Sequence, residues 1–152
     1  MDDVDHGTRM VSYLGSFIHS LDDKGRVSMP AAYRRGGAES RFVLAQVNEP
    51  ALTLFPESTW ASVEERLREL VRRKPETRLW VLEKVANAVE VIPDSQGRIL
   101  IPARLQEAAD LDGQVQLIGA IDRVELWNPA AFERAVREKA GDLGEYAPQI
   151  FL

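Results

Sequence analysis

The sequence predicts an α+β fold built from two tandem halves related by a pseudo-two-fold axis. Three observations predict it. The charged segment LDDKGRVSMPA at 21–31 returns as PDSQGRILIPA at 93–103. Short segments with period-two hydrophobic alternation surround both copies, as expected for half-buried strands. Each half then ends in a segment with the 3.6-residue hydrophobic spacing of a helix.

The similarity of the halves extends beyond the charged segment. An ungapped shift of 72 residues superimposes seven identical residues within 39 positions, and five of them cluster within ten positions. Chance rarely produces such a cluster, so we interpret the halves as homologous repeats. The identical pairs are Asp22/Asp94, Gly25/Gly97, Arg26/Arg98, Pro30/Pro102, Ala31/Ala103, Val43/Val115 and Leu54/Leu126.

The repeats divide the chain. We expect the first repeat at 13–73, a helical connector at 74–86, the second repeat at 87–141 and a C-terminal tail at 142–152. The acidic, polar start predicts a disordered extension at 1–9. Neither half carries enough apolar surface for a stable core of its own, so we expect the halves to pack against each other.

Eight strands are predicted, four in each repeat. All are short and bounded by turn residues. The first two strands of each repeat flank the D-x-x-G-R turn and are expected to form a hairpin, while the last two form a second pair. Strands are expected at 13–20, 26–29, 41–47 and 51–55, and at 86–92, 98–101, 114–120 and 123–127.

Helices are predicted between and after the strands. Pro30 and Pro102 fit the first position of a short helix, because proline lacks the N–H group that a helix start leaves unpaired. The segment 56–73 has hydrophobic residues at helical spacing, with Ser58 or Thr59 as its N-terminal cap. Further helices are expected at 75–88 and 128–140.

Charge is distributed unevenly along the chain. The formal net charge of −5 argues at first against a nucleic-acid partner, because phosphates favour positive surfaces. Residues 15–41, however, hold five basic and three acidic side chains, and residues 94–104 hold two basic and one acidic. Residues 105–152 hold four basic and nine acidic side chains. The basic excess is therefore centred on the two turns.

Several classes of protein are disfavoured. The chain has no cysteine, which excludes disulfides and thiolate metal sites and suits a reducing cytosol. No segment has the length and hydropathy of a membrane span or signal peptide, so we expect a cytoplasmic protein without a membrane partner. No metal-ligand spacing and no cofactor motif is present. We therefore expect no metal, no cofactor and no small-molecule substrate.

An enzyme is disfavoured because nucleophiles need an activating base and only two histidines exist. His6 lies in the polar N-terminal segment. His19 lies on a predicted strand, where a half-buried structural imidazole is the simpler interpretation. Glu64 and Arg68 have the spacing of an exposed helical ion pair. We therefore assign no catalytic residues.

The D-x-x-G-R turn carries the functional hypothesis. An aspartate at the head of a turn accepts backbone N–H bonds, and a glycine three residues later takes a positive φ, so D-x-x-G alone is an ordinary hairpin connection. That interpretation leaves Arg26 and Arg98 unexplained. A guanidinium at the mouth of a hairpin suits phosphate or the O6 and N7 edge of guanine. The structural alternative is a salt bridge from either arginine to its turn aspartate.

The segments YLGSFIHSLDDKGRVSMPAAYR and PDSQGRILIPARL resemble the MraZ family of bacterial transcriptional regulators, over residues 13–142. The resemblance implies the SpoVT/AbrB swapped-hairpin fold, with two β-barrel halves and flanking helices in one chain. It also implies a ring-shaped homo-oligomer associated with the nucleoid. Members of the family bind short guanine-containing direct repeats in double-stranded DNA, at the promoter of the division and cell wall gene cluster that includes their own gene.

The same resemblance implies roles for turn residues. Lys24 and Arg26 of the first turn and Arg98 of the second would contact DNA. Gln96 stands where the first turn has Lys24, so it can hydrogen-bond DNA but adds no charge, and we expect the turns to contribute unequally. The turn-shaping residues would be Asp22, Gly25, Asp94 and Gly97.

Two alternatives remain open. The first is a ring-forming interaction or scaffold protein without specific DNA binding, in which the turns serve folding; the negative net charge favours it. The second is an antitoxin-like member of the same superfamily, although such proteins usually carry one motif per chain. Substitution of Arg26 and Arg98 separates the first from a DNA reader, because a structural hairpin should tolerate it.

Overall fold

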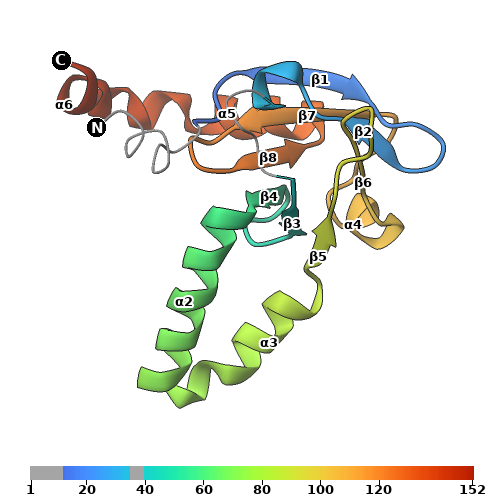
Figure 1. The fold of residues 1–152 in the computed structure, drawn as a ribbon. Helices are drawn as coiled ribbons and strands as arrows, with labels where there is room; N and C mark the ends of the chain where they lie inside the picture. The colour runs from blue at the N-terminus through green and yellow to red at the C-terminus, as the bar shows by residue number, and fades with distance from the viewer. Residues whose placement is uncertain (1–11, 35–39) are drawn as a thin grey trace, which may run out of the picture.

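A computed structural model describes residues 12–34 and 40–152, so the extension predicted at 1–9 lies outside the described residues. All eight predicted strands are present, most of them shorter than expected (Figure 1). The strands are β1 (Ser16–Ser20), β2 (Arg26–Ser28), β3 (Phe42–Ala45), β4 (Leu52–Pro56), β5 (Val89–Val91), β6 (Arg98–Leu100), β7 (Gln114–Gly119) and β8 (Val124–Trp127). The helical segments are η1 (Ala31–Arg34), α2 (Glu57–Arg73), η2 (Pro75–Thr77), α3 (Arg78–Ala86), α4 (Ala103–Ala108), α5 (Pro129–Leu143), η3 (Gly144–Tyr146) and α6 (Ala147–Phe151).

The strands form two antiparallel sheets whose order is symmetric. The larger sheet has six strands in the order β1-β7-β8-β4-β3-β5, and the smaller is the two-stranded ribbon β2-β6. In this sheet β1 is equivalent to β5, β7 to β3 and β8 to β4. If each strand is replaced by its equivalent, the strand order is the same read in the opposite direction. The two repeats are therefore related by a pseudo-two-fold axis, as the sequence predicted.

The pairing expected across each turn is wrong. β1 pairs with β7 and β2 pairs with β6, so the strands on either side of the first turn enter different sheets. β5 likewise pairs with β3 of the first repeat. Each repeat therefore gives both arms of its turn to the other repeat, which is the swapped-hairpin arrangement. The second pairs, β3 with β4 and β7 with β8, form within each repeat as expected.

The axis passes through two pairs of equivalent residues. In the ribbon, Val27 lies opposite Ile99, and in the large sheet Thr53 lies opposite Glu125. Both pairs differ by 72 residues, which is the shift that aligned the repeats. The two turns are thus placed on opposite sides of one axis.

One of the seven aligned pairs, Val43 with Val115, is wrong. Leu44 of the first repeat lies between Leu54 and Val89 in the sheet. Leu117 of the second repeat lies between their equivalents, Leu126 and Phe17. Leu44 is therefore the equivalent of Leu117, a shift of 73 residues along these two strands. Val43 consequently lies on the opposite face from the buried Val115.

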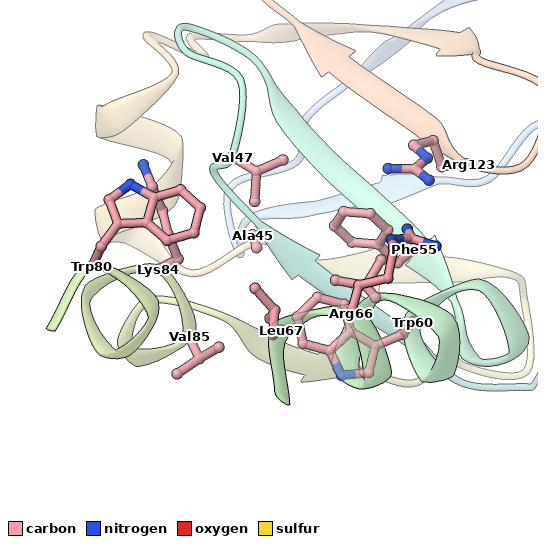
Figure 2. A pocket seen from close by; sticks show the side chains of 11 residues that line it. Ala45, Val47, Phe55, Trp60, Arg66, Leu67, Trp80, Lys84, Val85 and Arg123 are labelled. Atoms are coloured by element: carbon pink, nitrogen blue, oxygen red, sulfur yellow. The ribbon is translucent and has the colours of Figure 1, made fainter. Parts of the chain in front are cut away.

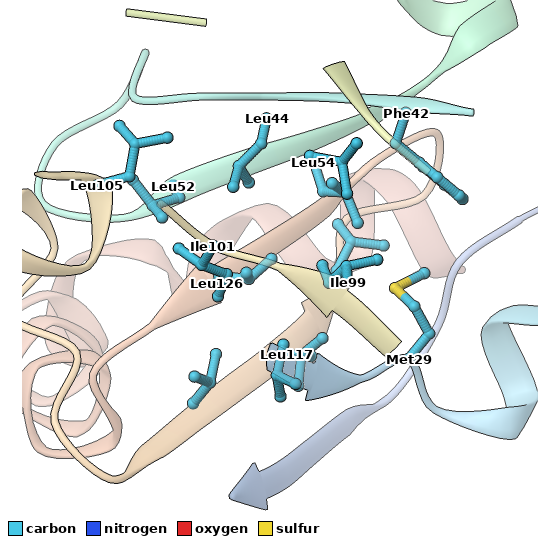
Figure 3. Close-up of a cluster of buried hydrophobic side chains, with 14 of the residues drawn as sticks. Met29, Phe42, Leu44, Leu52, Leu54, Ile99, Ile101, Leu105, Leu117 and Leu126 are labelled. Atoms are coloured by element: carbon cyan, nitrogen blue, oxygen red, sulfur yellow. The ribbon is translucent and has the colours of Figure 1, made fainter. Parts of the chain in front are cut away.

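The hydrophobic core lies between the ribbon and the large sheet. Val27, Met29, Ile99 and Ile101 bring apolar side chains from the ribbon and the residues that follow it. Figure 3 shows Met29, Ile99 and Ile101 among leucines of the large sheet. Among the described residues the strands do not close into two separate barrels, because β1 and β5 remain the edges of one sheet. Both repeats therefore share a single core.

Aromatic residues join the outer face of the large sheet to the helices. Phe55 of β4 packs on Trp60 of α2 with ring centroids 5.2 Å apart. The equivalent residues Trp127 and Phe132 pack in the same way at 5.3 Å. Figure 1 shows α2 continuing with α3 as an arm that projects from the sheets.

The helix starts differ from expectation. Pro56, not Ser58 or Thr59, occupies the cap position of α2. Thr59 instead donates its hydroxyl to the carbonyl oxygen of Asp122 at 2.8 Å. Pro102 precedes α4 as its cap residue rather than its first helical residue. The cap of α5 is Asn128, whose side chain accepts a hydrogen bond from the N–H of Ala131.

Candidate nucleic-acid interface

The first turn is organised around the carboxylate of Asp22. Its Oδ1 accepts hydrogen bonds from the backbone N–H groups of Lys24 at 2.9 Å and Arg26 at 2.8 Å. Its Oδ2 accepts one from Nε of Arg26 at 2.9 Å. Gly25 has a φ of +84°, which a residue with a Cβ adopts only with strain, and its N–H donates to the carbonyl of Asp22 at 3.0 Å. Hydrogen bonds to both the side chain and the backbone carbonyl of Asp22 therefore hold the turn in shape.

The second turn repeats this arrangement bond for bond. Oδ1 of Asp94 accepts from the N–H groups of Gln96 and Arg98, both at 2.9 Å, and Oδ2 accepts from Nε of Arg98 at 2.9 Å. Gly97 has a φ of +78° and donates to the carbonyl of Asp94 at 2.9 Å. The two turns thus share one geometry although Lys24 is replaced by Gln96.

Hydrogen bonding keeps both carboxylates charged. The N–H of Arg26 lowers the pKa of Asp22 below the usual 3.8, more strongly than partial burial raises it. The N–H of Arg98 lowers the pKa of Asp94 in the same way. The salt bridge considered from the sequence is therefore present in both turns.

The ion pairs involve Nε of each guanidinium and leave its terminal Nη1 and Nη2 groups available. The hydrogen bonds that Arg26 and Arg98 make with described side chains run through Nε, so Nη1 and Nη2 have no partner there. Both side chains are 29% exposed. Each aspartate therefore holds an arginine in a fixed direction while four N–H donors remain available to a ligand.

Both arginines lie on the same face of the β2-β6 ribbon. Because side chains alternate along a strand, the inward positions of Val27 and Ile99 direct Arg26 and Arg98 outward. Arg26 lies opposite Leu100, so the two arginines are diagonal neighbours, with Cα atoms about 7–8 Å apart for such a pair. Their backbones belong to one rigid ribbon.

Each turn is also bonded to the other repeat. The carbonyl of Gly25 accepts a hydrogen bond from the N–H of Ile101 at 2.8 Å. The carbonyl of Gly97 accepts one from the N–H of Met29 at 2.9 Å. Since Met29 and Ile101 are buried, these bonds tie the turns directly to the core.

Comparison with known proteins identifies the family. The model of the family described as "MraZ protein, putative antitoxin-like" matches the chain twice, at residues 13–82 and 85–146. The chain belongs to the MraZ family. The two matched segments each contain one of the turns described above.

MraZ relatives align along most of the chain. A protein of Pediococcus pentosaceus is 36% identical over 138 residues, which covers 91% of this chain and 96% of the relative. One of Azotobacter vinelandii is 37% identical, covering 86% of this chain and 93% of its own. One of Desulfitobacterium hafniense is 39% identical over 78% of this chain and 82% of its own. All three carry the name "Transcriptional regulator MraZ".

Two residues near the turns of this MraZ chain were not identified from the sequence. Arg34, at the end of η1, lies against Gly97, and Gln106, in α4, lies against Gly25. Each therefore contacts the turn of the opposite repeat. The sequence carried one signal, since Arg34 and Gln106 are equivalent under the 72-residue shift. Which turn each would reach depends on the strand exchange.

His19 belongs to no group of metal-binding side chains among the described residues. Nδ1 of His19 lies 2.8 Å from the carbonyl oxygen of Ser28, which bridges β1 to β2 and supports a structural role. His6 lies outside the described residues. Within 12–34 and 40–152, no three histidine, aspartate or glutamate side chains are grouped to hold a metal ion. No helix in that part of the MraZ chain is long and apolar enough to cross a membrane.

The arm holds an apolar hollow that is separate from the turns. Trp60 and Leu67 of α2 and Trp80 of α3 line it, together with Phe55 of β4 (Figure 2). Lys84 lies 5.9 Å from the ring centroid of Trp80. The hollow contains no turn residue, so it does not belong to the candidate interface.

Proposed function

We propose that this protein is a DNA-binding transcriptional regulator whose two D-x-x-G-R turns contact double-stranded DNA. The name shared by its relatives, transcriptional regulator, supports the regulatory role. Arg26 and Arg98 supply the main contacts, with Lys24 and Gln96 at the tips of the turns. We propose no catalytic role.

One observation carries the proposal: two turns with identical hydrogen bonding each present an arginine that is anchored through Nε. An anchored guanidinium loses little side-chain entropy on binding, because its direction is already fixed. Its open Nη atoms suit phosphate oxygens or the O6 and N7 acceptors of guanine. The aspartate therefore positions the arginine, and the arginine contacts DNA.

A single subunit has few such contacts. Affinity for DNA falls with log salt concentration by about 0.9 for each neutralised phosphate, so three or four contacts bind weakly at cellular salt. We propose that the protein forms a ring homo-oligomer, which presents several copies of the turn to short guanine-containing direct repeats. Linked contacts raise avidity by roughly 10²–10⁴ where their spacing matches the DNA.

The proposed targets are promoter repeats of the division and cell wall gene cluster, including the promoter of the protein's own gene. Binding there places the protein in the cytoplasm, at the nucleoid. The acidic residues of 105–152 would then be directed away from the phosphates, because like charges repel.

The experiment is a fluorescence-anisotropy titration at two salt concentrations. The probe is a labelled duplex from upstream of the protein's own gene, with a scrambled duplex of equal length beside it. The variants are Arg26→Ala with Arg98→Ala, and a control with Arg78→Ala and Arg134→Ala, which removes two exposed arginines from α3 and α5. Thermal unfolding checks that all variants fold.

We expect specific, salt-sensitive binding by the wild type and the control, and its loss in the turn variant. If the wild type shows no preference for the upstream duplex at either salt concentration, DNA regulation is refuted. The ring-forming interaction protein, which the salt-bridged arginines and the negative charge favour, would then replace it.

A further inference from the structure

The loss of charge at the second turn is matched by a side chain from the first repeat. Lys24 stands at the tip of the first turn and Gln96 at the tip of the second. The residues that approach the turns from the opposite repeats show the reverse difference. Gln106 approaches the first turn, and Arg34 approaches the second.

The contacts are close in both turns. A Cβ atom built on Gly97 would lie 2.6 Å from Nη1 and 3.0 Å from Cζ of Arg34. A Cβ atom built on Gly25 would lie 2.6 Å from Nε2 of Gln106. The ends of these two side chains therefore lie directly on the backbone of the turns.

The two approaching side chains differ in what else they contact. Nε2 of Gln106 donates to the carbonyl of Ile101 at 2.7 Å, so this amide is held in place. Arg34 is exposed and makes no hydrogen bond or ion pair with another described residue. Its charge is therefore available to a ligand at the second turn.

The two turns carry corresponding cations and amides, although the first turn also has the exposed Asp23 where the second has Ser95. The first turn combines Arg26 and Lys24 with the neutral Gln106. The second combines Arg98 and Arg34 with the neutral Gln96. Each set has two cations and one amide, although the positions of the second cation and the amide are exchanged.

We propose that Arg34 is a DNA-contacting residue that supplies the second cation of the second turn, so that both turns of a subunit bring two cations to the phosphate backbone. This inference rests on the proposed function. The cation missing at the tip of the second turn is then supplied by the other repeat.

The test measures how the affinity for the upstream duplex depends on salt. Arg34→Gln should lower the slope of log affinity against log salt by about 0.9 for each subunit whose second turn lies on the duplex. Lys24→Gln should lower it equally at the first turn. Arg78→Gln, which removes an exposed charge from the arm, should leave the slope unchanged.

A second substitution that restores the lost charge distinguishes a DNA contact by Arg34 from a role of Arg34 in folding. The double variant Arg34→Gln, Gln96→Lys again has a second cation at the second turn, now at the tip of the turn itself. The slope of log affinity against log salt should therefore return to the wild-type value. Unfolding midpoints confirm that each variant is folded. If Arg34→Gln leaves the slope unchanged, or if Gln96→Lys does not restore it, Arg34 is not a phosphate contact.

The outcomes also distinguish this inference from the proposed function. Loss of binding in the Arg26→Ala, Arg98→Ala protein together with an unchanged slope in Arg34→Gln would overturn only the role of Arg34. Absence of specific binding by the wild type would overturn both.

Discussion

Val27 and Ile99 lie directly opposite each other in the ribbon, and each is the other's equivalent in the duplicated sequence. Both are buried, with 1% and 0% of their surface exposed. The turns end one residue before each of them, at Arg26 and Arg98. This one pair therefore links the packing of the core to the relative position of the two turn arginines.

Ile99→Ala should destabilise the whole protein. The substitution leaves a cavity at the axis, and comparable truncations cost about 2–5 kcal/mol. Because both repeats share one core, tryptophan fluorescence and circular dichroism should report one coincident urea transition. The measurement needs a fixed protein concentration, since association shifts apparent stability. Two separate transitions would show that the repeats unfold independently.

Gly25→Ala should cost more stability than Gly113→Ala. Both glycines have a positive φ, +84° and +81°, so each substitution adds about 1–2 kcal/mol of backbone strain. A Cβ on Gly25 would also lie 3.1 Å from the carbonyl oxygen of Ile101, whereas nothing lies within 4 Å of a Cβ on Gly113. Urea unfolding of the two variants gives the comparison. Equal losses would mean that the turn can shift away from β6.

Acid should remove the stabilisation that the turn carboxylates provide. Asp22 and Asp94 have lowered pKa values in the folded protein, so the unfolded chain binds their protons more readily. Their contribution is complete above the ordinary carboxyl pKa of about 3.8 and is lost as pH falls through the lower folded value. The difference in unfolding free energy between wild type and the Asp22→Asn, Asp94→Asn protein should be constant from about pH 7 to 5 and narrow below about 4. A difference that grows on acidification would contradict this sign.

Thr53→Val should stabilise the protein. Thr53 is completely buried at the axis, and its hydroxyl has no hydrogen-bond partner in the described part of the chain. Removing an unpaired buried hydroxyl without changing the volume should gain about 1 kcal/mol. Thr59→Val is the matched control, because the Thr59 hydroxyl donates to Asp122 and its removal should be destabilising. The midpoint of urea unfolding should therefore move in opposite directions in the two variants.

The sequence predicted the elements of the fold well and their pairing poorly. Period-two alternation in segments such as 98–101 shows which side chains face inward, but it carries no information on which strand lies alongside. The D-x-x-G-R turn indicated a local hairpin, whereas burial of the apolar faces of both repeats was achieved by exchanging strands. The duplication itself was the better guide, because it required a symmetric partner for every strand.

At the candidate site, too, contacts between residues close in the sequence could be predicted, whereas contacts between the two repeats could not. Asp22 and Arg26 are four residues apart, so their ion pair could be considered from the sequence alone. The contact between Arg34 and Gly97 joins the two repeats across 63 residues, and it depends on the ribbon crossing. A side chain that completes a distant turn cannot be identified before the strand partners are known.

The exchange of strands has a consequence for synthesis of the chain on the ribosome. β1 must wait for β7, whose residues Gln114–Gly119 are made about a hundred positions later, and β2 must wait for β6. A nascent chain that ends within the arm therefore has β3 and β4 as its only complete strand pair among the described residues. Its unpaired strand edges can join those of another nascent chain. Rapid completion of the second repeat thus protects the first from mispairing between neighbouring polypeptides.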